Sequence, residues 1–172
     1  MRSGYRPTKS CSIGSATCSS AQTTIERGAS VPCQFHLSGG KLDQAARVQD
    51  ASAKIFTDLE NGDFLFIDSS HVSKVGSDVN FLLFEVLPNL PIGAFVHFHD
   101  VCWPFEYPAK WIAEGQSWNE AYLLRAFLAF NDSFQIVFWV PFAALRWSDT
   151  IKERMPAYLI SPGGAIWIRR TR

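Results

Sequence analysis

The chain lacks an excess of either charge. Its 172 residues carry 16 Lys and Arg against 16 Asp and Glu, so the formal net charge at neutral pH is zero. A protein that binds nucleic acid or an anionic membrane through surface charge is typically basic. The composition therefore gives no reason to expect either partner.

Long apolar runs are also missing. No segment approaches the roughly 18 apolar residues that a membrane-spanning helix requires, and the first residues lack the apolar core of a secretory signal. We therefore expect a cytoplasmic location. Hydrophobic residues still make up 47% of the chain, which is enough for one domain with a core.

Closely spaced cysteine pairs are absent. The four cysteines, Cys11, Cys18, Cys33 and Cys102, include no C-x-x-C pair of the kind that binds zinc. A zinc site formed by the first three with His36 is one interpretation. Free thiols in a reducing compartment is the interpretation that we favour.

Residues 1–43 show little apolar periodicity. They are rich in Ser, Thr, Gly and Cys, and Glu26 is the only acidic residue before residue 41. Such a composition buries little apolar surface. We therefore predict an irregular or disordered segment over residues 1–43 and an α/β domain over residues 44–172.

Two short apolar runs that end in polar residues dominate the region after residue 60. The run 64–67 leads into Asp68-Ser69-Ser70-His71, and the run 94–98 leads into His99-Asp100. Between them, apolar residues at helical spacing predict a helix over 76–88. A strand, a helix and a second strand form a right-handed crossover with parallel strands. Asp68 and Asp100 should therefore meet at one edge of the sheet.

The remaining segments complete the predicted domain. The pattern predicts a short strand over 45–48, a helix over 51–59, a helix over 118–131, a strand over 134–142, a short helix over 147–154 and a last strand over 165–170. The aromatic-rich loop 101–117 either stacks on a ligand or covers the sheet.

Several motifs in this order resemble bacterial class I S-adenosylmethionine-dependent methyltransferases over residues 45–172. The motifs are Val48-Gln49-Asp50, the run 62–71, the runs 76–80 and 85–88, the runs 96–100 and 104–108, the runs 118–120 and 122–124, and Gly163-Gly164 with 167–170. The resemblance implies a partial Rossmann-like sheet, mostly parallel with an antiparallel last strand. Strand 63–68 would lie beside 94–100, then 164–170, with 134–142 at the far edge.

The first strand and glycine-rich turn of such enzymes are not evident. Only residues 12–19 offer a candidate turn, with a single glycine, Gly14. Without a first strand, the run 64–67 becomes an exposed apolar edge through which the chain would form a homo-oligomer.

The resemblance implies methyl transfer from S-adenosylmethionine to a hydroxyl of a small molecule or sugar, assisted by Mg²⁺. Because the glycine-rich turn is not evident, the sequence leaves open whether this chain is an enzyme. The alternative is a truncated, inactive remnant that acts as an interaction module or needs a partner strand. A hydrolase that uses the same acid pair is a third interpretation.

Asp68 and Asp100 are the candidate metal ligands, since Mg²⁺ prefers oxygen atoms. In the alternative, Asp68 caps the following helix and Asp100 binds loop amides. His71 or His99 is the candidate general base, because imidazole titrates near neutral pH. His99 would otherwise bind the metal. His97 is expected to be a core histidine with satisfied hydrogen bonds.

Asp50, Asp68, Ser69 and Ser70 are the candidate cofactor-binding residues. The resemblance implies that Asp50 accepts a hydrogen bond from the adenine amine, and the alternative is that it caps the helix 51–59. Ser69 and Ser70 either bind the carboxylate of the cofactor or cap a turn.

Overall fold

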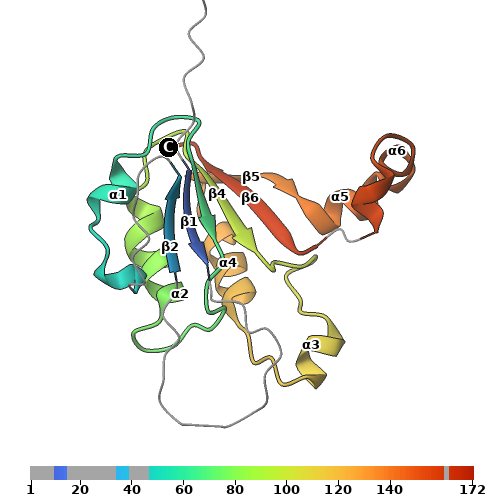
Figure 1. Ribbon diagram of the computed structural model, residues 1–172, viewed down its shortest axis with the longest axis horizontal. Helices are drawn as coiled ribbons and strands as arrows, with labels where there is room; N and C mark the ends of the chain where they lie inside the picture. Colours follow the sequence, from blue (N-terminus) through green and yellow to red (C-terminus); the bar gives the residue numbers. More distant parts are fainter. Residues whose placement is uncertain (1–9, 15–33, 39–46, 161–162) are drawn as a thin grey trace, which may run out of the picture.

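A six-stranded open mixed sheet forms the centre of this α/β fold. The computed structural model describes residues 10–14, 34–38, 47–160 and 163–172, and Figure 1 shows the arrangement. The strand order is β2-β1-β3-β4-β6-β5. The strands are β1 (Ser10–Gly14), β2 (Gln34–Ser38), β3 (Phe64–Ile67), β4 (Phe95–His99), β5 (Phe134–Trp139) and β6 (Ala165–Arg170).

The directions of β3, β4 and β6 follow the predicted pattern, whereas β2 adds an antiparallel strand at the other edge of the sheet. Strands β1, β3 and β4 are parallel neighbours, whereas β6 runs antiparallel between β4 and β5. The predicted α/β class and the order of the last four strands are confirmed. Strand β5 is shorter than the predicted 134–142, because Pro141 lies in the first turn of helix α5 (Val140–Arg146). Proline suits a first helical turn, where its missing N–H is not needed.

The expectation of an exposed edge at residues 64–67 is wrong. Strand β1 pairs in parallel with β3, with Ile13 opposite Ile67, and β2 pairs antiparallel with β1. Strands pair through hydrogen bonds between backbone groups. A polar segment can therefore pair with an apolar strand. The irregular structure predicted for residues 1–43 is therefore wrong at these two strands. Cys18 and Cys33, and with them the proposed zinc site, lie outside the described residues.

The segment before β3 also differs from its prediction. Val48–Asp50 forms a 3-10 turn (η1) where the predicted strand 45–48 would end, and residues 45–46 lie outside the described residues. A backbone hydrogen bond from Asp50 N–H to Arg47 O, at 2.9 Å, closes this turn. Helix α1 covers only Lys54–Thr57 of the predicted 51–59.

Helices cover one face of the sheet. The predicted helix 76–88 is present as α2 (Asp78–Phe81), continued by the π-helical turn η2 (Leu82–Val86) and the 3-10 turn η3 (Leu87–Asn89). Helix α4 (Glu120–Ala129) is the predicted helix 118–131. Six of the strand side chains in the core are at most 1% exposed: Leu65, Ile67, Val96, Phe98, Ile166 and Ile168. Burial of each such side chain contributes about 1.5–3 kcal/mol.

Alternate residues of the same strands carry aromatic rings. A hollow of about 370 Å³ is lined by Gly62, Phe64, Phe95, Val137, Phe138 and Trp167. Phe64 and Phe95 begin β3 and β4. The hollow therefore lies toward the amino ends of these strands, away from the acids that follow their carboxyl ends.

The segment 101–117 covers the end of the sheet. Phe105 and Tyr107 are buried in the core, and the Phe105 ring lies 4.4 Å from that of Trp139. Two roles were open for the rings of this loop, stacking on a ligand or covering the sheet. Phe105 and Tyr107 cover the sheet. Helix α3 (Ala109–Ala113) lies within the segment.

The region between β5 and β6 contains three short helical segments. Helix α5 is followed by α6 (Ser148–Arg154), as predicted for 147–154, and by the 3-10 turn η4 (Pro156–Leu159). Helices α5 and α6 extend beyond the β5 edge (Figure 1). None of the described helices has the length and apolar character needed to cross a membrane.

Candidate functional site

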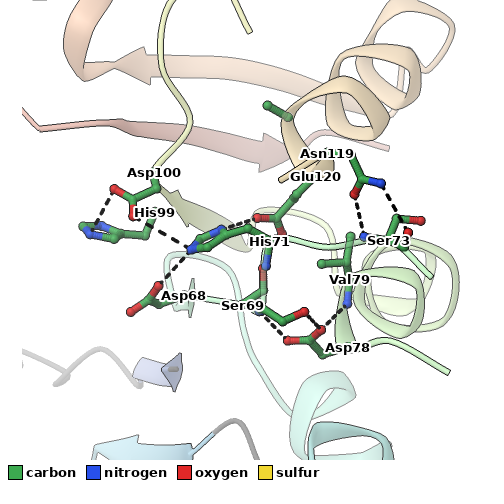
Figure 2. A network of polar contacts seen from close by, with 12 residues as sticks. Asp68, Ser69, His71, Ser73, Asp78, Val79, His99, Asp100, Asn119 and Glu120 are labelled. Carbon is green, nitrogen blue, oxygen red and sulfur yellow. Dashed lines mark hydrogen bonds and ion pairs between the residues drawn. The ribbon is translucent and has the colours of Figure 1, made fainter. Parts of the chain in front are cut away.

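Two carboxylates meet at the carboxyl ends of β3 and β4. Ile67 and Phe98 are paired in the sheet, so Asp68 and Asp100 follow neighbouring strands. Figure 2 shows both carboxylates beside the imidazole of His71. The Nε2 atom of His71 lies 3.5 Å from Oδ1 of Asp68 and 3.8 Å from Oδ2 of Asp100.

The backbone of His71 is fixed on both sides. Its φ of 57° lies in the left-handed region, which is unfavourable for a residue with a side chain. Its N–H donates to Oγ of Ser69 at 2.9 Å. Its carbonyl accepts the N–H groups of Asn119 and Glu120, at 2.9 and 3.1 Å, from the start of α4. These bonds hold the loop after β3 against α4.

Glu120 is a site residue that the sequence analysis missed. Its Oε2 atom lies 2.8 Å from Nδ1 of His71, and the two side chains are 2% and 6% exposed. The sequence contained one indication. Glu120 stands three and four residues before Leu123 and Leu124, so it occupies the apolar face of the predicted helix. A carboxylate on that face needs a partner.

The three acids keep His71 protonated. Burial by itself would lower the pKa of the His71 imidazole. The contacts with Asp68 and Glu120, together with the charge of Asp100, outweigh burial and raise the pKa to about 9. At neutral pH both ring nitrogens therefore carry hydrogen. In this state His71 cannot accept a proton, so the arrangement does not favour the predicted role of His71 as a general base.

His99 is more accessible to solvent than His71. Its side chain is 43% exposed, and Nε2 lies 3.5 Å from Oδ1 of Asp100. The carboxylate of Asp100 therefore lies between two imidazoles, one buried and one open to solvent. An exposed imidazole next to a carboxylate is suited to proton transfer.

His97 is buried, as expected, on the aromatic face of the sheet. Its ring lies 4.5 Å from that of Phe66 and 4.7 Å from that of Trp167. Burial, chiefly, together with the charge of His99, lowers the pKa of His97 to about 4. The expectation that its hydrogen bonds are satisfied is wrong at Nδ1, which is buried without a partner among the described residues.

Ser69 and Ser70 stabilise the loop rather than face a ligand. The N–H of Ser70 donates to Asp78 at 2.7 Å, and its hydroxyl donates to the same carboxylate. Ser69 accepts from His71 N–H, as described above. Of the two roles left open for these serines, the structure supports the turn-stabilising one. Asp78, at the start of α2, is a second residue that the sequence analysis missed.

The capping roles considered for Asp68 and Asp50 are wrong. Ser77, not Asp68, caps α2, because its side chain accepts from Asn80 N–H. The N-cap of α1 is Ala53 rather than Asp50. Asp50 is instead held at the surface by Arg47, at 2.8 and 2.9 Å, and this contact lowers its pKa. The described contacts of Asp100 are with His71 and His99.

The residues present do not fit the expected Mg²⁺ ion. Within the part of the chain that the structure describes, no group of three or more His, Cys, Asp or Glu side chains could hold a metal. The positive charge next to Asp68 and Asp100 is the imidazolium of His71. Its Nε2 atom lies within 4 Å of both carboxylates.

The residues at this site fit S-adenosylmethionine, the expected methyl donor, only in part. The Asp68 side chain is 22% exposed at the carboxyl end of β3, so its carboxylate can accept hydrogen bonds from a cationic ammonium group. Ser69 and Ser70 have their hydroxyls engaged within the loop. The segment after Gly14, where a glycine-rich turn would follow β1, lies outside the described residues.

Comparisons of the chain with protein-family models, with curated protein sequences and with solved structures give no match. A function for this site is therefore argued from its motifs and its geometry.

Proposed function

We propose that this protein is an S-adenosylmethionine-dependent methyltransferase that acts on a hydroxyl group of a small molecule. The observation that carries the proposal is the polar cluster at the carboxyl ends of the parallel strands β3 and β4. In open α/β sheets, ligands bind beyond the carboxyl ends of the strands. The antiparallel β6 between β4 and β5 agrees with the sheet that the resemblance implies.

Asp68 and Asp100 are the residues that would receive the donor. When bound, S-adenosylmethionine supplies an electrophilic methyl group on a positively charged sulfur. The two side chains are 22% and 24% exposed, so a ligand can reach them. His71 offsets part of their negative charge and holds them on either side of one imidazole edge.

His99 is the proposed general base. The donor would supply the methyl carbon, to which the acceptor oxygen would bond as the carbon–sulfur bond broke and the electron pair stayed on sulfur. The hydroxyl proton passes to His99. Because Nε2 of His99 faces Asp100, Nδ1 is the nitrogen available to accept it. Asp100 then stabilises the imidazolium, as an acid does behind a catalytic histidine.

Calorimetric titration of the full chain with S-adenosylmethionine tests the proposal. We expect a Kd below about 1 mM, and at least a tenfold weakening, or about 1.4 kcal/mol, in Asp68→Asn. Asp58→Asn is the matched control, because Asp58 is paired with Lys54 at the surface. The control should bind as the wild type does. If millimolar donor gives no heat, the proposal is wrong and the inactive remnant becomes the better interpretation.

A further inference from the structure

Glu120 is the most deeply buried acid of the site, at 1% exposed. We propose that Glu120 is a positioning residue, which fixes the His71 imidazole so that Nε2 faces the two strand-end carboxylates. Its contribution to methyl transfer rests on the function proposed above. Its effect on the His71 ring is a property of the free protein.

Helix capping does not account for the Glu120 carboxylate. The N-cap residue of α4 is Asn119, which makes no side-chain capping bond. The first N–H groups of the helix are already satisfied by other atoms. Those of Asn119 and Glu120 donate to the His71 carbonyl, and that of Ala121 donates to the Tyr107 hydroxyl at 2.9 Å. The carboxylate is thus available for His71.

The burial of this carboxylate points the same way. A buried carboxylate is costly unless it is paired with a cation. Its Oε2 atom contacts Nδ1 of His71, and its Oε1 atom is buried without a partner among the described residues. A carboxylate placed only for stability would be expected to have both oxygens satisfied. The described contact of the Glu120 carboxylate is with the Nδ1 side of the His71 ring.

The other contacts of His71 leave a single edge of the ring open. The Trp118 ring packs against the imidazole with centroids 4.3 Å apart, and the backbone of His71 is bonded at both N–H and carbonyl. With Nδ1 held by Glu120, only Nε2 is directed at Asp68 and Asp100 (Figure 2). Its distances of 3.5 and 3.8 Å are longer than a good hydrogen bond. Such contacts often tighten when a ligand binds.

Two variants separate the effect of the charge of Glu120 from the effect of its side-chain length. Glu120→Gln keeps the length of the side chain but removes the charge, whereas Glu120→Asp keeps the charge but shortens the side chain. Glu106→Gln is the matched control, because Glu106 is an exposed glutamate bonded to the Tyr122 hydroxyl. All three are compared with the wild type by ¹⁵N NMR of the histidine rings and by donor-binding calorimetry.

In the free protein at pH 7.5, we expect both ring nitrogens of His71 to be protonated in the wild type and in Glu106→Gln. In Glu120→Gln we expect a neutral ring. Removal of a residue that orients a metal-binding histidine typically costs 10- to 100-fold, and we expect donor affinity or turnover to fall by a factor of the same order. Glu120→Asp should restore the protonated ring but not the full affinity.

Unchanged His71 ring signals in Glu120→Gln would overturn the proposal. If that variant does not fold, the wild-type spectrum still decides, because a His71 Nδ1 proton in fast exchange with water is incompatible with the Glu120 contact. A ring that responds to Glu120 in a protein that binds no donor would refute methyl transfer while leaving the positioning role intact.

Discussion

His71 and His97 are both buried, at 5% and 7% exposed, yet their surroundings give them different protonation states. His71 lies among three carboxylates, which raise its pKa to about 9 against the effect of burial. His97 lies between aromatic rings on the sheet, where burial lowers its pKa to about 4. One region is therefore built around a cation, and the other around a neutral ring.

The comparison shows that the contacts of a histidine, rather than its burial, decide its chemical role. His71 follows the buried strand β3, and His97 belongs to the buried strand β4. Only His71 has acids supplied by β3, β4 and α4 together. A region that directs three acids at one buried ring is a stronger candidate for function than one that isolates its ring.

Removal of the His71 ring should produce the largest loss of stability. His71→Phe leaves Glu120 buried without its partner and brings Asp68 and Asp100 together without a cation. Loss of one partner from a buried ion pair typically costs about 3–5 kcal/mol. Urea unfolding at pH 7 measures this change. His99→Phe serves as the control, since the His99 side chain is 43% exposed, and equal losses in the two variants would contradict the comparison.

The His97 region should make the protein sensitive to acid. The unfolded state takes up a proton near pH 6.5 and the folded state only near pH 4. Between these values the unfolded state binds more protons, so stability falls as pH falls. The difference between the ordinary pKa of 6.5 and the folded pKa of about 4 corresponds to a loss of about 3 kcal/mol by pH 4. Urea unfolding from pH 7 to pH 4 should show a smaller loss in His97→Phe, and parallel curves for the two proteins would refute this assignment.

The His71 region should respond in the opposite direction. Its folded pKa of about 9 lies above the ordinary histidine value of 6.5, so the folded state binds more protons between these values. Its contribution is complete below pH 6.5 and is lost as pH rises through 9. The stability difference between wild type and Glu120→Gln should therefore narrow from pH 7 to pH 9.5. A constant difference would show that His71 is not charged.

A smaller effect is expected where Gly164 packs under the acid region. A Cβ atom at this position would lie 3.2 Å from Cα of Asp100 and 3.1 Å from Sγ of Cys102. Gly164→Ala should therefore push on the Asp100 backbone and cost about 1–3 kcal/mol, as overpacking usually does. Thermal unfolding of Gly164→Ala with and without Cys102→Ala separates the two contacts. Full rescue by Cys102→Ala would show that the Asp100 backbone is not under pressure.

Much of the sheet could be predicted because its evidence is local. The apolar run at 64–67 and the polar residues after it define both the strand and the end at which its acids lie. The end of β5 was missed because the run of apolar residues continues through Pro141 into α5. Strand β1 was missed because its pairing with β3 uses backbone groups, about which side-chain composition says little.

The site was harder to predict because its decisive contacts join distant segments. His71 and Glu120 are 49 positions apart, and nothing in either local sequence specifies that the start of α4 meets the loop after β3. The Ser70–Asp78 bond spans only eight positions. It could have been inferred from an aspartate at the start of a predicted helix facing a serine-rich turn.

The ionisation state of the two histidine rings in the wild-type protein tests the account most directly. We expect ¹⁵N NMR at pH 7.5 to show both nitrogens of His71 protonated, while His97 stays neutral down to pH 5.5. A neutral His71 at pH 7.5 would contradict the account, because the three carboxylates would then have no shared cation.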